Sequence, residues 1–93
     1  MGERAQIRDI SVVSSSLIVS FGECIRALRL ARGMTQLEFS ERCGFYQTYL
    51  SRIENGQANP TLNAIEVMAN GLGMTVFDVF QYIKLSQEST VDA

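Results

Sequence analysis

The sequence contains no histidine and only two cysteines, Cys24 and Cys43. Without histidine, two thiols are too few for a metal site of the usual ligand spacing, and they are also too few for a disulfide framework. We expect both thiols to be reduced, with a redox role for either left open. The missing histidine also removes the commonest general base, and no glycine-rich phosphate loop is present. The sequence therefore predicts a protein that is not an enzyme and needs no cofactor.

Long apolar runs are also lacking. None approaches the ~18 residues of a membrane-spanning helix, and serines interrupt the apolar residues near the N-terminus in a pattern unlike that of a signal peptide. We expect a cytoplasmic protein that is not attached to a membrane. The 93 residues leave room for one domain, and a composition of 46% hydrophobic and 19% charged residues is ordinary for a globular protein.

Positive charge is scarce overall, since the formal net charge is −2. This balance argues mildly against nucleic acid, because affinity for phosphate normally comes from lysine and arginine. The distribution is uneven, however. Residues 21–60 hold five arginines and four glutamates, whereas residues 60–93 hold one lysine against four acids. The positive charge is therefore concentrated toward the middle of the chain.

Start and stop signals predict five short helices. Ser20 and Glu23 have the spacing of a capping box and place the start of the first helix at Ser20, while Thr35 and Thr75 are N-cap residues of later helices. The predicted helices span residues 20–32, 36–43, 47–54, 62–72 and 76–84. We expect an arm of uncertain structure at 1–19, a folded domain at 20–85 and a flexible polar tail at 86–93.

Four motifs at fixed spacings carry a family resemblance. They are Gly33-Met34-Thr35-Gln36, Cys43-Gly44, residues 49–56 (YLSRIENG) and Asn59-Pro60-Thr61-Leu62. Over residues 21–80 the chain resembles the lambda-repressor-like, Cro/CI-type (XRE) helix-turn-helix family. The resemblance implies an all-α, five-helix DNA-binding domain. A small Ser40 and Gly44 would let two short helices cross closely, while Leu50 and Ile53 would hold the third helix on the core.

In this family the third helix lies in the major groove of double-stranded DNA with its N-terminal residues on base edges. Gln47 can pair with adenine, Thr48 can meet a thymine methyl, and Arg52 can reach guanine or phosphate. Without the family motifs, the same residues would be an ordinary solvated helix face. Tyr49 can either stack over the core or lie against the sugar-phosphate backbone, and we favour contact with DNA. The residues implied to bind DNA are Gln36, Tyr46, Gln47, Thr48, Tyr49, Ser51, Arg52 and Asn55, of which Gln36 and Asn55 match positions that grip phosphate.

The chain departs from the family pattern at two positions and matches it at one further pair of residues. Tyr46 stands where a small capping serine or threonine is more common, so the third helix would be poorly capped or Tyr46 would touch DNA. Arg29 and Glu54 match a pair that forms an internal salt bridge in several members, which assigns both to structure. The fifth helix is apolar nearly all round, and Phe77 replaces a polar residue. We expect a two-fold dimer interface of Phe77, Phe80, Tyr82 and Ile83.

The resemblance implies a homodimeric transcription regulator. Such a protein would bind a palindromic operator with half-sites about one helical turn apart, and would block or recruit RNA polymerase. With no room for a second domain, the chain looks like a restriction-modification controller protein or a small phage-type repressor. The alternative is a protein-binding module, an antitoxin or anti-repressor that keeps the helix-turn-helix as a scaffold. The acidic pI of about 5.0 favours that alternative.

Overall fold

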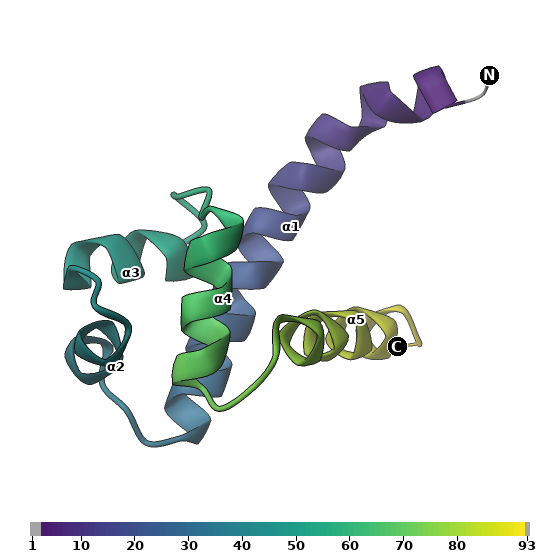
Figure 1. Ribbon diagram of the computed structural model, residues 1–93. Helices are drawn as coiled ribbons and strands as arrows, with labels where there is room; N and C mark the ends of the chain where they lie inside the picture. Colours follow the sequence, from purple (N-terminus) through teal and green to yellow (C-terminus); the bar gives the residue numbers. More distant parts are fainter. Residues whose placement is uncertain (1–2, 93) are drawn as a thin grey trace.

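The computed structural model describes the backbone of residues 3–92 and the side chains of residues 17–87. Within that part of the chain all regular secondary structure is helical, which confirms the predicted all-α class (Figure 1). The helices are α1 (Glu3–Ala31), α2 (Gln36–Cys43), α3 (Gln47–Glu54), α4 (Leu62–Gly71) and α5 (Val76–Asp92). The second and third helices have the predicted bounds, 36–43 and 47–54.

Capping chemistry sets the bounds of α2. The Thr35 side chain accepts a hydrogen bond from the backbone N–H of Glu38 at 3.0 Å, and the Glu38 carboxylate accepts one from the Thr35 N–H at 2.8 Å. These two bonds satisfy donors that a helix start leaves free. The pKa of the Glu38 carboxyl is held below its ordinary value of 4.5, mainly by the backbone hydrogen bond from Thr35 and next by the side-chain hydrogen bond with the same residue. Gly44 ends the helix with a φ of 76°, a conformation that glycine adopts without strain.

The first helix is longer than the capping pattern predicts. It begins at Glu3, so the prediction of a start at Ser20 is wrong. No glycine or proline occurs between Glu3 and Phe21, so nothing in the sequence forces the helix to stop there. Ser20 lies inside the helix, where its Oγ accepts a hydrogen bond from Nε2 of Gln87 at 2.9 Å. A serine followed three residues later by a glutamate can therefore occur within a helix as well as at its start.

The fifth helix also continues past its predicted end. It runs to Asp92, whereas loss of apolar residues placed the end near Lys84. Residues 76–92 contain neither glycine nor proline, and a helix in progress adds residues at little cost. Polar composition alone is therefore a weak signal for a helix end.

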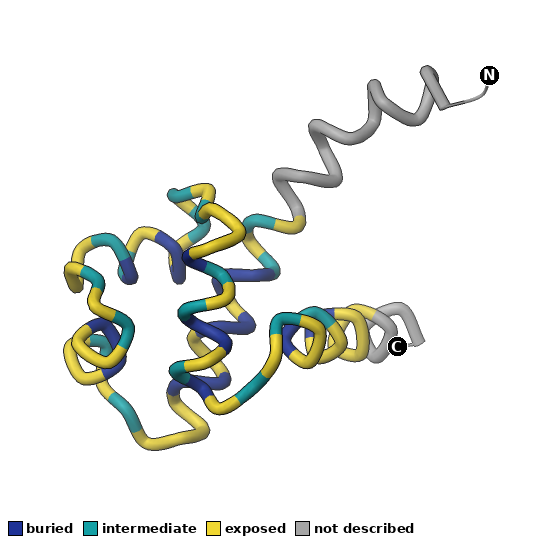
Figure 2. The backbone as a smooth tube through the Cα atoms, viewed as in Figure 1, coloured by how far each residue is buried: buried dark blue, intermediate teal, exposed yellow. Residues whose placement is uncertain are grey.

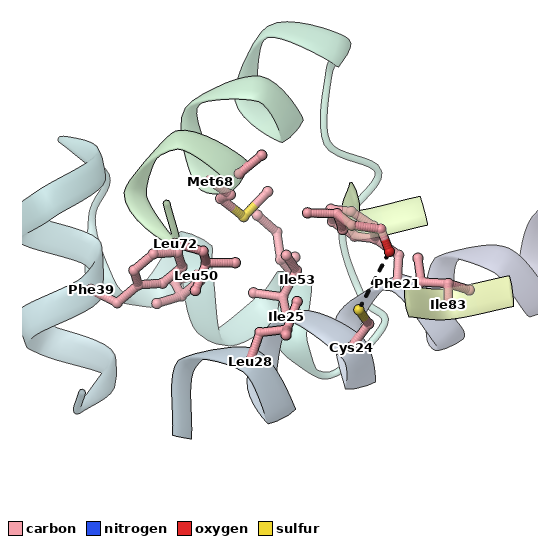
Figure 3. Close-up of a cluster of buried hydrophobic side chains, with 12 residues drawn as sticks. Phe21, Cys24, Ile25, Leu28, Phe39, Leu50, Ile53, Met68, Leu72 and Ile83 are labelled. Carbon is pink, nitrogen blue, oxygen red and sulfur yellow. Dashed lines mark hydrogen bonds between the residues drawn. The ribbon is translucent and has the colours of Figure 1, made fainter. Parts of the chain in front are cut away.

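All five helices contribute to the structure around one hydrophobic core (Figures 2 and 3). The C-terminal part of α1 passes behind α4, with α2 and α3 on one side of α4 and α5 on the other (Figure 1). Leu50 and Ile53 of α3 are fully or almost fully buried, as predicted. The buried cluster consists of Phe21, Cys24, Ile25, Leu28, Phe39, Leu50, Ile53, Met68, Ala69, Leu72, Val79 and Ile83. These buried contacts fix the orientation of α3 relative to the other helices.

Two small residues lie at buried positions of their helices. Gly22 of α1 lies against the C-terminal end of α3, where a Cβ atom built on Gly22 would be 2.2 Å from the carbonyl oxygen of Ile53. Ser40 of α2 is buried, and its hydroxyl donates to the carbonyl of Leu37 at 2.8 Å. Burial of Ser40 agrees with the small side chain of the family pattern, whereas the close approach at Gly22 was not predicted, because the capping pattern places Gly22 in the first turn of a helix.

Candidate nucleic-acid interface

The start of α3 is exposed and lacks a side-chain cap. Tyr46 occupies the N-cap position with φ −71° and ψ 144°, but its side chain makes no capping hydrogen bond. Its ring is 86% exposed, and Gln47 and Thr48 beside it are also exposed. The first N–H groups of a helix carry a partial positive charge and suit an anion when nothing in the protein caps them. This end of α3 therefore presents polar side chains and free backbone donors.

The opposite face of α3 is anchored. Leu50 and Ile53 reach into the core, and Tyr49 is half-buried with its ring edge-on to Phe45 at a centroid distance of 5.1 Å. This contact matches the core-stacking interpretation of Tyr49 that the sequence left open. A short helix held on one face by apolar contacts can offer its other face at a defined orientation.

The C-terminal turn of α3 carries three further predicted residues. One guanidinium nitrogen of Arg52, Nη2, donates to the carbonyl of Gln57 at 3.0 Å, while the side chain as a whole is exposed. Asn55 Nδ2 lies 3.5 Å from the hydroxyl oxygen of Ser51. These contacts link side chains of α3 to each other and to the following loop. Arg52 keeps other N–H donors that can face a ligand, because a guanidinium carries five.

A buried ion pair joins α1 to α3. Arg29 donates from Nε to one carboxylate oxygen of Glu54 at 2.7 Å and from Nη2 to the other at 3.0 Å. A third nitrogen, Nη1, donates to the carbonyl of Met34 at 2.8 Å in the turn before α2. The structure thus contains the pair that the family resemblance implied. The paired side chains are 7% and 1% exposed, so the ion pair is shielded from water.

Gln36, at the start of α2, has an unpredicted partner. Its Nε2 atom donates to Oε1 of Glu54 at 3.0 Å, and its side chain is half-buried. The family resemblance assigns Gln36 to phosphate binding and Glu54 to an internal salt bridge, with no contact between them. Their 18-residue separation offers no local pattern that could have indicated the contact. The structure brings Gln36 together with the ion pair at the base of the exposed face of α3.

Two other arginines serve a different part of the fold. Arg32 donates to the carbonyl of Leu72 at 2.7 Å, and Arg42 lies 3.4 Å from the carbonyl of Gly71. Both guanidinium groups therefore lie at the C-terminal end of α4, where positive charge complements free carbonyls and the helix dipole. They line an open cleft of about 630 Å³ between the C-terminal ends of α1, α2 and α4. Part of the central positive charge thus stabilises a helix end.

Both cysteines lie in surroundings that disfavour the thiolate. Cys24 is buried and Cys43 is half-buried, and both are free thiols. Burial raises the pKa of each thiol to about 11, with Arg42 opposing the shift at Cys43. The thiolate, which is the nucleophile and the metal ligand, is therefore scarce at neutral pH. Nowhere in the described residues do three potential metal-binding side chains gather.

The predicted dimer residues separate into two groups. Phe77 is 82% exposed and Tyr82 is 40% exposed. Ile83 belongs to the buried core, so its assignment to an interface is wrong: it lies four residues after Val79, on the inner face of α5. Phe80 is half-buried, with its ring 6.1 Å from that of Phe21.

No helix in the described part of the chain is both long and apolar enough to cross a membrane.

Comparisons with known proteins agree with this arrangement. A helix-turn-helix domain family matches residues 20–78. The chain is 34% identical over 58 residues to the immunity repressor protein of Bacillus phage phi105, a match that covers 62% of the chain but only 40% of the repressor. It is 30% identical over 71 residues to control protein C.BamHI of Bacillus amyloliquefaciens, which covers 75% of the chain and 88% of that protein.

A solved structure shows the same fold. The restriction-modification controller protein C.Esp1396I, as a tetramer in complex with its natural 35 base-pair operator, is 28% identical with a TM-score of 0.68. The match covers 72% of this chain and 88% of that chain. The family match spans more than half of the sequence, and C.BamHI is matched over most of its length. The chain therefore belongs to the Cro/CI-type helix-turn-helix family of DNA-binding transcription regulators.

Proposed function

We propose that the protein binds a palindromic operator as a homodimer, with one α3 helix in the major groove of each half-site. The carrying observation is that α3 is anchored by Leu50 and Ile53 while its uncapped N-terminal end is exposed. The likeness to a controller protein solved in complex with its operator supports binding to an operator. A dimer of this kind spaces its half-sites about 34 Å apart, which is one turn of DNA.

The exposed residues of α3 divide by chemistry into base readers and phosphate binders. Gln47 offers a bidentate amide that suits adenine, and Thr48 offers a hydroxyl and a methyl group. Arg52 extends from the next turn toward guanine or phosphate, while Gln36 and Asn55 hold the backbone. Tyr46, exposed at the N-cap, adds a ring at the edge of this surface. Base edges then determine sequence, and phosphates determine register.

The names of two relatives support a proposal for the regulated genes. C.BamHI is named as a control protein, and C.Esp1396I as a restriction-modification controller protein. We propose that this protein likewise controls restriction-modification genes, in the cytoplasm, by blocking or recruiting RNA polymerase at its operator. A chain of net charge −2 would bind DNA through a local surface and not through its overall charge.

Replacing Arg52 with alanine is expected to weaken operator binding by about 1 to 3 kcal/mol, or roughly 5- to 150-fold. Selection from random duplexes at fixed, near-physiological salt would first supply the operator, and fluorescence anisotropy would then measure the affinity. Arg26→Ala is the matched control, because it removes the same charge from an exposed position of α1. Equal affinities for the two variants, or no sequence enriched by the native protein, would favour the protein-binding module instead.

Exposed apolar side chains of α5 support the dimer. Phe77 and Tyr82 are exposed there together with Leu85, and Phe80 borders a small apolar hollow of about 80 Å³. Exposed aromatic side chains grouped on one helix are typical of interface cores. Two copies related by a two-fold axis would bury the same residues from each side. The proposed interface contains Phe77, Phe80 and Tyr82, whereas Ile83 lies in the core.

Replacing Phe77 with glutamate is expected to weaken the dimer by about 2 kcal/mol or more, or roughly 30-fold, because a buried aromatic contact would become a desolvated charge. Sedimentation velocity over a concentration series measures the dissociation. The monomer fold should survive, because the side chain is mostly exposed in the single chain. Ala27→Glu, at an exposed position of α1, controls for the added charge. A Phe77→Glu protein that remains dimeric would contradict this interface.

A further inference from the structure

We infer that Glu54 is a positioning residue for DNA binding: it holds the side chain of Gln36 in the orientation that contacts phosphate. The inference rests on the proposed function, in which Gln36 binds the DNA backbone. It assigns a second role to an ion pair whose evident role is to join α1 to α3. This second role depends on Oε1 of Glu54, which accepts one hydrogen bond from Arg29 and another from Gln36.

Glu54 is a fixed acceptor. Oε2 accepts from Nε of Arg29 at 2.7 Å, and Oε1 accepts from Nη2 of Arg29 at 3.0 Å, which is a bidentate arrangement. Oε1 also accepts from Nε2 of Gln36 at 3.0 Å. The planar fork of Arg29 defines where both oxygens lie, and the Glu54 side chain is 1% exposed. An acceptor held in this way offers Gln36 one position in space.

The bond also decides which way the amide of Gln36 faces. A carboxylate can only accept, so the amide nitrogen must be the atom that lies against Glu54. That nitrogen carries two N–H donors, and Glu54 uses one of them. The second N–H remains on a side chain that is only half-buried, and a phosphate oxygen is a suitable acceptor for it. Glu54 therefore fixes which end of the amide lies against the buried ion pair, and it leaves one N–H of that nitrogen for another acceptor.

The local backbone fits this role. Gln36 is the first residue of α2, and the cap formed by Thr35 engages the N–H of Glu38. The N–H groups of Gln36 and Leu37 are the remaining donors of that turn, so side-chain and backbone donors belong to the same helix start. Arg29 also holds the preceding turn through the carbonyl of Met34 at 2.8 Å. One buried pair thus orders both the side chain and the backbone near the phosphate.

A double-mutant cycle tests the inference. Arg29→Met with Glu54→Leu replaces the pair by apolar side chains, a change that proteins often tolerate, and removes the acceptor of Gln36. Free of Glu54, Gln36 must be ordered upon binding, so affinity for the selected duplex is expected to fall about 3- to 10-fold. Adding Gln36→Ala should then cost less than it costs in the native background. Equal fold losses from Gln36→Ala in both backgrounds would overturn the inference.

Two further readouts separate positioning from general support of the fold. Loss of a phosphate contact should weaken a scrambled duplex by the same factor as the selected one, whereas a displaced α3 should weaken mainly the selected one. Thermal unfolding of each variant reports whether the fold is intact. Should the pair-replaced protein fail to fold, NMR of the native protein decides. A single Gln36 rotamer with its side-chain amide protected in the free protein supports positioning, and rotamer averaging contradicts it.

The inference and the proposed function fail in different ways. If Gln36→Ala leaves the affinity unchanged while Arg52→Ala lowers it, the protein binds DNA and the role of Glu54 is overturned. If the native protein retains neither selected nor scrambled duplexes, the proposed function itself fails, and with it the phosphate contact on which the role of Glu54 depends.

Discussion

Replacing Gly22 with alanine is expected to destabilise the protein by about 3 kcal/mol or more, which corresponds to a fall in Tm of roughly 15 °C for a domain of this size. The added Cβ would be 2.2 Å from the carbonyl oxygen of Ile53 and 3.0 Å from that of Glu54. Both obstacles are backbone atoms, so no side chain can rotate away. The α1 and α3 helices would have to separate, although alanine by itself favours a helix by up to about 1 kcal/mol over glycine.

Urea denaturation followed by circular dichroism measures this effect. Glu23→Ala is the matched control, since it places alanine at the next, exposed position of the same helix and should change stability little. Because Ile53 and Glu54 close α3, a separated α1–α3 contact would also displace the proposed DNA-binding face. An alanine variant as stable as the native protein would mean that α1 and α3 do not meet at this distance.

The helix bounds near the middle of the chain could be predicted because local chemistry decides them. Thr35 caps α2 by a bond within four residues, and Gly44 ends it with a left-handed backbone. Such signals are complete within one turn of sequence. The start of α1 has no comparable signal, and the one that seemed present, at Ser20, lies within the helix. A pattern that resembles a cap does not start a helix when the residues before it are already helical.

The candidate site likewise has features that the local sequence predicts and features that depend on tertiary packing. The outward face of α3 follows from the apolar spacing of Leu50 and Ile53, which the sequence displays directly. Burial of Ile83 depends instead on which helices cover α5, and α1 and α4 both contact it. The bond from Gln36 to Glu54 and the approach at Gly22 also join residues far apart in sequence. These features arise from tertiary packing, so periodicity and composition could not reveal them.

Removing one partner of the buried Arg29–Glu54 ion pair is expected to have the largest effect on the free energy of unfolding. Arg29→Met leaves the Glu54 carboxylate, 1% exposed, with Gln36 as its remaining hydrogen-bond donor. An uncompensated buried charge of this kind costs about 3 to 5 kcal/mol. Glu54→Leu leaves the Arg29 guanidinium with the carbonyl of Met34 alone and should cost a similar amount.

The double replacement, Arg29→Met with Glu54→Leu, should be more stable than either single variant, because it removes both charges together and leaves none unpaired. Urea denaturation of the four proteins measures the coupling between the two positions, and single losses below about 1 kcal/mol would show that water screens the pair. A large coupling in stability, together with lower DNA affinity in the double variant, would separate the two roles of Glu54. The apolar pair can still join α1 to α3, but it offers Gln36 no acceptor.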